Sequence, residues 1–271
     1  MYFDSPNGST FEWLLVPLKP INEDDINSAM NKLVIYEPPQ DGCDYGFGID
    51  TGTGIGEDRT VLSLARTGRE DIPDHQAAEF FSESITTAEL APFAACIAAL
   101  YAPYIPTYRQ PKFCIEQVRK YGDHPQVQLK KMGFYRHHRM TRYDGKKIEE
   151  RHGNKDGWFT QTWSRPYLTG AFVDAVNNGW YKPNSPYLIA ELETWEQKYT
   201  TEGKTRIEHQ TGKHDDCIFG AALSYITQHH LDVMIERSKR KYDRPKSSLP
   251  EIDFSPYNPS EFRVSTMRDR L

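Results

Sequence analysis

The side chains best suited to chemistry are acids that stand where short apolar runs begin or end. Asp50 and Glu116 each follow such a run, and Asp215 and Asp216 directly precede one. A buried strand does not end in a charge without a partner, because an unpaired buried charge is costly. Divalent cations such as Mg²⁺ and Mn²⁺ prefer carboxylate oxygens. We therefore interpret Asp50, Glu116 and Asp216 as a candidate divalent-metal site; the alternative for Asp50 alone is that it caps a turn.

Asp216 is favoured over Asp215 as the metal ligand. Consecutive residues of a helix point about 100° apart, so both cannot face one site. Gly220, one turn further on, leaves room for the helix to pack near a sheet. Asp215 then supports the ligands or caps the helix. Asp58 is expected to support them too, by holding a metal-bound water or a basic side chain; the alternative is a plain turn residue before a strand.

These acids need a scaffold that brings strand ends and a helix start together. Residues 45–49 and 60–65 are β-rich runs joined by a glycine-rich connection, which predicts an antiparallel hairpin. Thr86–Glu89 forms a capping box, which predicts a helix that runs to about Tyr101. The strand expected at 112–116 follows that helix, so it should pair in parallel with an earlier strand.

Short strands and helices are expected along the rest of the chain. The remaining expected elements are strands at 76–82 and 134–139, hairpins at 142–147 and 200–210, and helices at 21–33, 125–132, 165–178, 186–199 and 216–230. This order predicts an α/β fold with a mixed central β-sheet flanked by helices. We assign residues 45–231 to the folded domain, 1–44 to a linker ahead of it, and 232–271 to a polar, basic and flexible tail.

A local excess of positive charge lies in the middle of a chain whose net charge is −5. Between residues 119 and 155, Lys and Arg outnumber Asp and Glu by eleven to four. Such a patch is typical of a surface that binds nucleic-acid phosphates; a solvated Lys-rich loop is the alternative. An Asp-Gly pair at its centre predicts a tight turn that projects Arg142, Lys146 and Lys147, which we expect to bind DNA.

Composition and spacing exclude several other classes. The four cysteines lack CxxC spacing and are expected to be reduced. There is no apolar run that could cross a membrane and no signal-peptide pattern at the N-terminus, so we expect a protein that is not secreted. Gly203-Lys204-Thr205 resembles the end of an ATP-binding P-loop, but Lys198 stands where its first glycine would be.

Taken together, these residues resemble the nuclease domain of the large terminase subunit of tailed bacteriophages, which belongs to the RNase H-like superfamily. The resemblance covers about residues 45–230, in the family's order. It rests on Gly48-Ile-Asp50-x-Gly with Asp58 eight residues on, Ile115-Glu116-Gln117 followed by Gly122, Gly157-Trp158, the 165–178 helix, and His214-Asp215-Asp216 at the start of the last helix. Acids at strand ends are common, so the order and spacing of these motifs carry the resemblance together.

The resemblance implies an RNase H-like mixed sheet and a metal-dependent endonuclease that cuts double-stranded viral concatemer DNA during genome packaging. In two-metal-ion hydrolysis, two Mg²⁺ or Mn²⁺ ions help to deprotonate water and stabilise the leaving 3′ oxygen. Asp50 would bridge both ions, Glu116 would bind one, and Asp216 the other. The implied partners are double-stranded DNA, the packaging ATPase, the small terminase and the portal protein, in the host cell cytoplasm.

The chain departs from a complete large terminase, which begins with a P-loop ATPase domain that is absent here. It would correspond either to an excised domain or to a separately encoded nuclease. The rival readings are a Holliday-junction resolvase, with the same acids and metals on branched DNA, and a catalytically silent DNA-binding or assembly module. An actin/Hsp70-type ATPase would need a second glycine-rich Asp loop. A DEDD exonuclease would show Asp-x-Glu where this chain has Asp50-Thr-Gly52.

Overall fold

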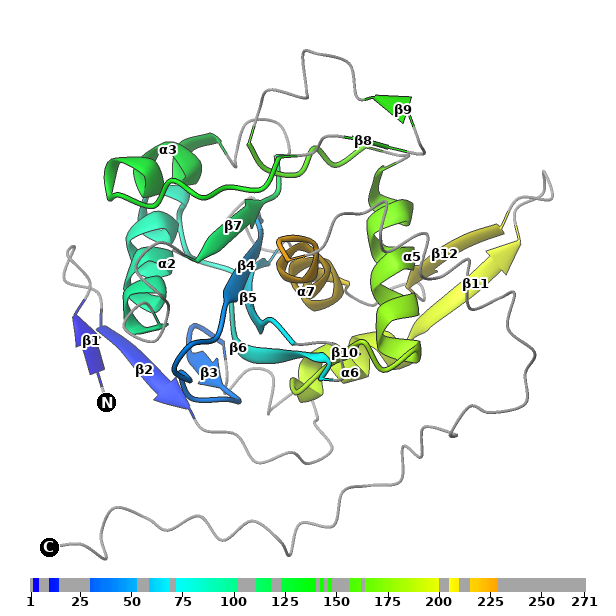
Figure 1. The fold of residues 1–271 in the computed structure, drawn as a ribbon, viewed down its shortest axis with the longest axis horizontal. Helices are drawn as coiled ribbons and strands as arrows, with labels where there is room; N and C mark the ends of the chain where they lie inside the picture. The colour runs from blue at the N-terminus through cyan, green and yellow to red at the C-terminus, as the bar shows by residue number, and fades with distance from the viewer. Residues whose placement is uncertain are drawn as a thin grey trace, which may run out of the picture.

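A mixed β-sheet runs through the centre of the protein (Figure 1). The computed structural model describes residues 2–4, 10–14, 30–52, 59–68, 72–101, 111–117, 123–139, 142–143, 146–147, 156–161, 164–199, 205–209 and 215–228. The sheet strands are β1 (Tyr2–Asp4), β2 (Thr10–Leu14), β3 (Leu33–Ile35), β4 (Tyr45–Asp50), β5 (Thr60–Arg66), β6 (Asp74–Ser82), β7 (Lys112–Ile115) and β10 (Tyr181–Lys182).

The order of the strands is β1-β2-β3-β6-β5-β4-β7, and β10 pairs in parallel with the start of β6. The predicted hairpin is confirmed, because β4 and β5 pair antiparallel. The predicted parallel strand is confirmed as well, since β7 pairs in parallel with β4. Residues 1–44, expected as a linker, contribute β1, β2 and β3, and β3 pairs antiparallel with β6. The sheet is therefore mixed, as predicted.

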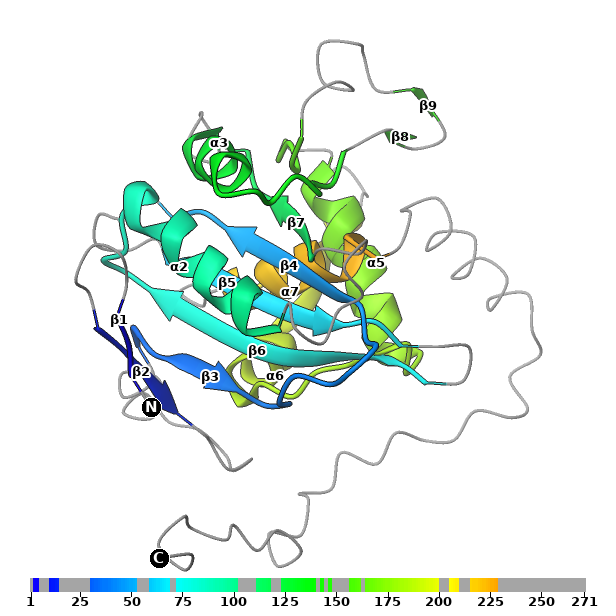
Figure 2. The same ribbon diagram turned by 60° about the vertical axis from the view of Figure 1, so that its left-hand side comes forward.

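Helices cover both faces of this sheet (Figure 2). The helices α2 (Thr87–Tyr101) and α3 (Asp123–Lys131) lie on one side, and α5 (Ser164–Asn177), α6 (Pro186–Glu193) and α7 (Asp216–Ile226) lie on the other. Each face has its own apolar core, with Phe47 and Leu62 packed on the α2 side and Val61 and Phe219 on the α7 side. The alternation of side chains along the strands produces these two separate cores.

Most of the local signals produce the expected elements. Thr86 and Glu89 exchange backbone and side-chain hydrogen bonds at the start of α2, as the capping box predicted. Gly133 and Gly179, just beyond α3 and α5, have positive φ angles, which glycine adopts easily after a helix. The hairpin expected at 142–147 is confirmed in its strands, because β8 (Arg142–Tyr143) pairs antiparallel with β9 (Lys146–Lys147).

Four of the expected elements differ from the structure. Leu33, expected in a helix, lies in β3, and residues 21–29 of that helix fall outside the described residues. Residues 134–139 form isolated bridges at His137 and Arg139 in place of a regular strand. The helix expected over 186–199 ends at Glu193, because Trp195–Tyr199 forms β11 and pairs with β12 (Thr205–His209). The expected 200–210 hairpin therefore begins five residues earlier.

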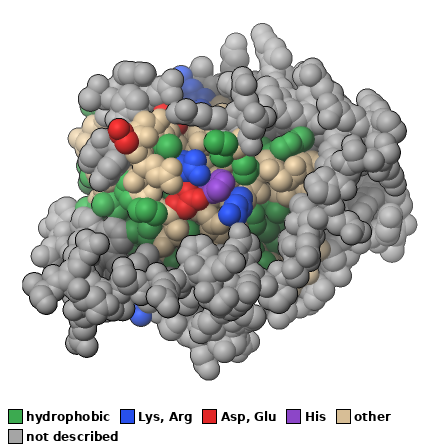
Figure 3. Space-filling view, turned by 60° about the horizontal axis from the view of Figure 1, so that its bottom comes forward, with side chains coloured by type: hydrophobic (Ala, Val, Ile, Leu, Met, Phe, Trp, Pro, Cys, Tyr) green, Lys and Arg blue, Asp and Glu red, His purple; other side chains and the backbone are tan. Residues whose placement is uncertain are grey.

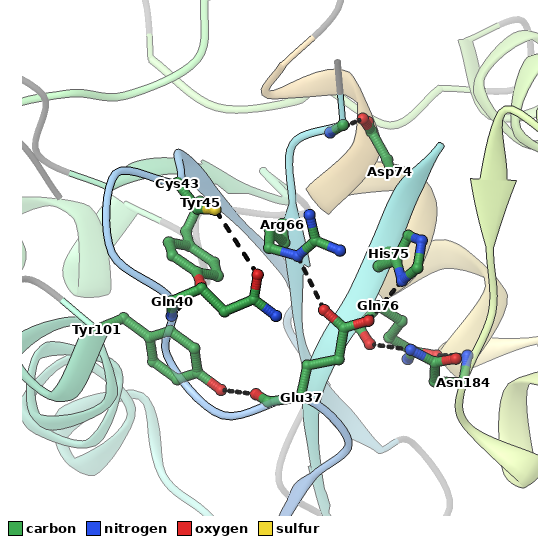
Figure 4. Close-up of polar contacts among 11 residues, drawn as sticks. Glu37, Gln40, Cys43, Tyr45, Arg66, Asp74, His75, Gln76, Tyr101 and Asn184 are labelled. Atoms are coloured by element: carbon green, nitrogen blue, oxygen red, sulfur yellow. Dashed lines mark hydrogen bonds and ion pairs between the residues drawn. The ribbon is translucent and has the colours of Figure 1, made fainter. Parts of the chain in front are cut away.

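A polar network holds the connection between β3 and β4 against the sheet (Figure 4). The Glu37 carboxylate accepts a hydrogen bond from Arg66 Nε over 2.9 Å and pairs with His75. Tyr101 Oη donates to the backbone oxygen of Glu37 over 2.9 Å. Arg66 ends β5, whereas Asp50 pairs near the start of that strand. This network therefore lies at the end of the sheet away from the predicted acids.

The surface of the described residues is mixed in character. Figure 3 shows basic, acidic and histidine side chains gathered on one face, with apolar side chains around them. Within the described part of the chain, none of the helices combines the length and the hydropathy needed to cross a membrane. The four cysteines are free thiols, as expected.

Candidate active site

Glycines allow α7 to lie directly on β4. A Cβ on Gly48 would stand 2.1 Å from the backbone oxygen of Gly220, and a Cβ on Gly46 would collide with Thr227. From the helix side, a Cβ on Gly220 would come within 2.8 Å of Val61 Cγ1. Contacts this short leave no space for any side chain. The helix therefore packs backbone against backbone on the strand, as the position of Gly220 in the sequence suggested.

The same packing places one acid of the strand beside one acid of the helix. Alternate residues of a strand share a face, so Asp50 follows the two glycines of β4 on the side of α7. Gly46 lies near the end of α7 and Gly48 near its middle, so the helix runs antiparallel to the strand. Because α7 begins at Asp216, that residue lies where β4 ends at Asp50.

Strand register brings Glu116 to the same place. Ile49 is paired with Ile115 in the parallel ladder, and the backbone N–H of Glu116 donates to Ile49 O over 2.9 Å. On its other side Glu116 forms a bridge with the buried Trp158. The two carboxyl groups at the strand ends are both buried, with Asp50 7% and Glu116 4% exposed.

The electrostatics of Asp50 show how closely the three acids converge. Burial raises the pKa of Asp50 well above its usual value, and the charge of Glu116 and a hydrogen bond between the two side chains raise it further. Asp216 adds to this effect, whereas Arg165 opposes it. A cation bound beside Asp50 would offset the negative charge that raises the pKa of this carboxyl group.

The acids fit a hard divalent cation in the chemistry of their donors. All three offer carboxylate oxygens, the ligands that Mg²⁺ and Mn²⁺ prefer. Among the described residues, however, no three His, Cys, Asp or Glu side chains are already arranged to enclose one ion. The site therefore brings the right donors together without a formed cage around an ion.

Asp215 faces a different partner from Asp216. It occupies the N-cap position of α7, yet its side chain makes no capping hydrogen bond. Instead, Asp215 Oδ1 accepts a hydrogen bond from Arg165 Nη2 over 2.8 Å. Asp216 is the member of the pair whose charge raises the pKa of Asp50. Asp215 and Asp216 thus face different neighbours, and the choice of Asp216 as the metal ligand stays a prediction.

The other predicted site residues are Asp58 and three cations of the basic region. Asp58 falls outside the described residues. Arg142, Lys146 and Lys147 belong to β8 and β9, and their use on DNA stays a prediction. Elsewhere in the basic region, Lys130 and Arg139 both pair with Asp156, which neutralises part of the predicted positive patch.

Sequence reasoning missed two residues beside the acids. Arg165 lies near the start of α5, and the negative charges of Asp215, Asp50 and Glu116 raise its pKa although burial alone would lower it. Its position in an amphipathic helix gave no signal of this role.

Glu191 is the second missed residue. It lies on α6, and its Oε2 accepts the backbone N–H of Ile218 over 3.0 Å. Burial, together with the charge of Asp216, raises the pKa of Glu191 to about 8. Glu191 follows Tyr187 and Leu188 at helical spacing, so an acid on the apolar face of a helix was the available signal.

Comparison with known proteins identifies the fold. Neither a protein-family model nor a curated protein sequence matches the chain. The crystal structure of the large terminase nuclease from thermophilic phage G20c with bound cobalt matches with a TM-score of 0.52 and 16% identity, over 79% of this chain and 92% of that one. The form of that nuclease with bound magnesium gives 0.51 and 18% over the same shares.

The Thermus phage P74-26 large terminase nuclease domain matches with a TM-score of 0.50 and 14% identity, over 79% of this chain and 90% of that one. At such identities the likeness concerns the fold. The chain has the RNase H-like fold of large terminase nuclease domains, as the sequence resemblance predicted.

Proposed function

We propose that this chain is a metal-dependent endonuclease that cuts double-stranded DNA during viral genome packaging. The observation that carries the proposal is the convergence of Asp50, Glu116 and Asp216 at two strand ends and one helix start. Burial and the charges of the two neighbouring acids raise the pKa of Asp50, and a bound cation would offset that accumulation of negative charge. The fold supports the same reading, because the similar structures are terminase nucleases and two of them hold a divalent metal.

The residues of the site have distinct roles in this proposal. Asp50, Glu116 and Asp216 would together hold Mg²⁺ or Mn²⁺, with Asp50 as the ligand that the two ions would share. When bound, such ions activate water and stabilise the leaving 3′ oxygen of the phosphodiester. The protein itself holds the acids in place through the β4–β7 ladder and the contact of α7 with β4. The DNA backbone is attracted by Arg142, Lys146 and Lys147. The protein partners are the packaging ATPase, the small terminase and the portal protein.

Cleavage of supercoiled plasmid with Mn²⁺ or Mg²⁺, with and without EDTA, tests the activity. We expect nicking and linearisation only with metal. Asp50→Asn, Glu116→Gln and Asp216→Asn should each abolish cleavage, and Asp215→Asn should reduce it less. Asp41→Asn, which changes an exposed acid, serves as the matched control. A fully active Asp50→Asn protein would contradict the assignment, and selective cutting of four-way junctions would point to a resolvase.

Thermal melting provides a second readout that does not depend on activity. In EDTA the Asp50→Asn protein should melt no lower than the wild type, because the substitution removes repulsion between buried acids. Added Mn²⁺ should raise the melting temperature of the wild type, since a ligand that binds only the folded state stabilises it. The same addition should leave Asp50→Asn unchanged. An equal shift in both proteins would place the metal elsewhere.

A further inference from the structure

Arg165 is a cation built into the edge of the acidic site. Its guanidinium lies 4.7 Å from the ring centroid of Phe219, on the first turn of α7, and its Nη2 donates to Asp215. The stacking and the ion pair fix the planar group in two directions. Its side chain is nevertheless 39% exposed, and within the described part of the chain the guanidinium makes no hydrogen bond other than the one to Asp215.

The ion pair between Arg165 and Asp215 adds little to the stability of the fold. A partly exposed salt bridge contributes little to stability. An Asp at an N-cap that bonds the helix backbone contributes at least as much. Asp215 stands at that position and is turned to Arg165 instead. Little net stability is therefore gained by this choice of partner.

A side chain of α6 caps the start of α7 instead. Glu191 reaches from α6 and accepts the N–H of Ile218, the third residue of α7, which an N-cap side chain normally bonds. This arrangement partly buries a carboxyl group that would otherwise be hydrated, which is unfavourable. Glu191 thus caps α7, and Asp215 remains paired with Arg165. The use of Glu191 in place of Asp215 as the cap is explained if the orientation of Arg165 matters for function.

We propose that Arg165 binds a DNA phosphate beside the three acids, and that Asp215 positions its guanidinium for this contact. The inference rests on the proposed nuclease function. A phosphodiester approaching Asp50, Glu116 and Asp216 meets negative charge, and Arg165 offers the compensating positive charge at the same place. A guanidinium with one edge bonded to Asp215 keeps further N–H groups for phosphate oxygens, and its planar fork matches their spacing.

Binding of a fluorescent DNA duplex in EDTA, measured by anisotropy over a range of salt concentrations, tests the phosphate contact without cleavage. Arg165→Ala should lower the slope of log K against log salt by about one unit, because one phosphate contact is lost. Arg165→Lys should keep most of the slope, and so should Asp215→Asn. Arg66→Lys is the matched control, since Arg66 is also paired with a carboxylate but lies at the far end of the sheet. An unchanged slope in Arg165→Ala overturns the proposal.

Plasmid cleavage and Mn²⁺ titration separate the contact from a purely structural role. Arg165→Ala and Arg165→Lys should each reduce kcat, the former by about 100-fold as for other lost transition-state donors. Both should still bind Mn²⁺ as well as the wild type does, because Arg165 is not a ligand. Loss of Mn²⁺ binding would instead make Arg165 a structural support and overturn the proposal. If the wild type fails to cleave at all, the nuclease function is wrong, while the salt slope in EDTA still decides whether Arg165 binds phosphate.

Discussion

Replacing Gly48 by Ala should show that one backbone contact supports both the fold and the site. The added Cβ would stand 2.1 Å from Gly220 O and 2.2 Å from Ser224 N, whereas ordinary contacts of a Cβ begin near 3.4 Å. Both neighbours are backbone atoms, so neither can rotate away. The helix α7 must therefore move off β4 by about 1 Å.

The cost of this movement can be approximated from overpacked cores. Inserting a methyl group into a well-packed core costs about 1–3 kcal/mol, and we expect the upper end because the backbone itself must shift. For a chain of this size, about 3 kcal/mol lowers the melting temperature by about 10 °C. Asp216 moves with the helix, and a misplacement of about 1 Å at a reacting group can lower the rate about 100-fold.

The assay combines thermal melting with plasmid cleavage at 25 °C, where the variant should remain folded. Gly170→Ala is the matched control, since Gly170 lies within α5 and a Cβ there has nothing within 4 Å. That change should stabilise the protein by about 0.5–1 kcal/mol, as Gly to Ala does inside a helix, and should leave cleavage unaltered. Wild-type melting and cleavage in Gly48→Ala would refute the close packing of α7 on β4.

Three other predictions concern individual side chains elsewhere in the protein. Glu191→Ala should lower the melting temperature and the rate, whereas Glu191→Gln, whose carbonyl can still accept the Ile218 N–H, should behave as wild type in both assays. Burial raises the pKa of Glu79 to about 7 from 4.5, so the folded state keeps a proton that the unfolded state loses between these values. Stability should therefore fall by up to about 3 kcal/mol as the pH rises from 4.5 through 7, and Glu79→Gln should flatten that dependence in melts from pH 4 to 8. Replacing Arg142, Lys146 and Lys147 by Ala should weaken DNA binding and reduce its salt dependence in titrations at several salt concentrations, with little change in melting temperature.

Elements coded by neighbouring residues could be predicted from the sequence. The capping box at Thr86–Glu89 and the glycine turns at Gly133 and Gly179 depend on contacts within one turn of helix, and each is found where expected. The β4–β5 hairpin likewise follows from two β-rich runs joined by a short glycine-rich segment. In these cases, the information is contained in a few consecutive residues.

Elements that depend on distant partners could not be predicted in the same way. Trp195–Tyr199 becomes a strand because β12 is available to pair with it, although its spacing also suits a helix. Leu33 joins β3 because it pairs with Phe80, far along the chain. Arg165 and Glu191 matter only because α5 and α6 pack against the start of α7, which no local pattern indicates.

The choice between Asp215 and Asp216 shows how sequence and structure combine. Residues four apart share one face of a helix, so the contact of Gly220 with β5 and of Ser224 with β4 also turns Asp216 toward the sheet. Asp215 is rotated by about 100° from that face, which directs it to α5 and Arg165. The glycine contacts thus fix the rotation of α7 about its axis. This rotation turns Asp216 toward the sheet and Asp215 toward α5. An acid that faces β4 can serve a metal site, whereas one that faces Arg165 can orient a cation toward phosphate.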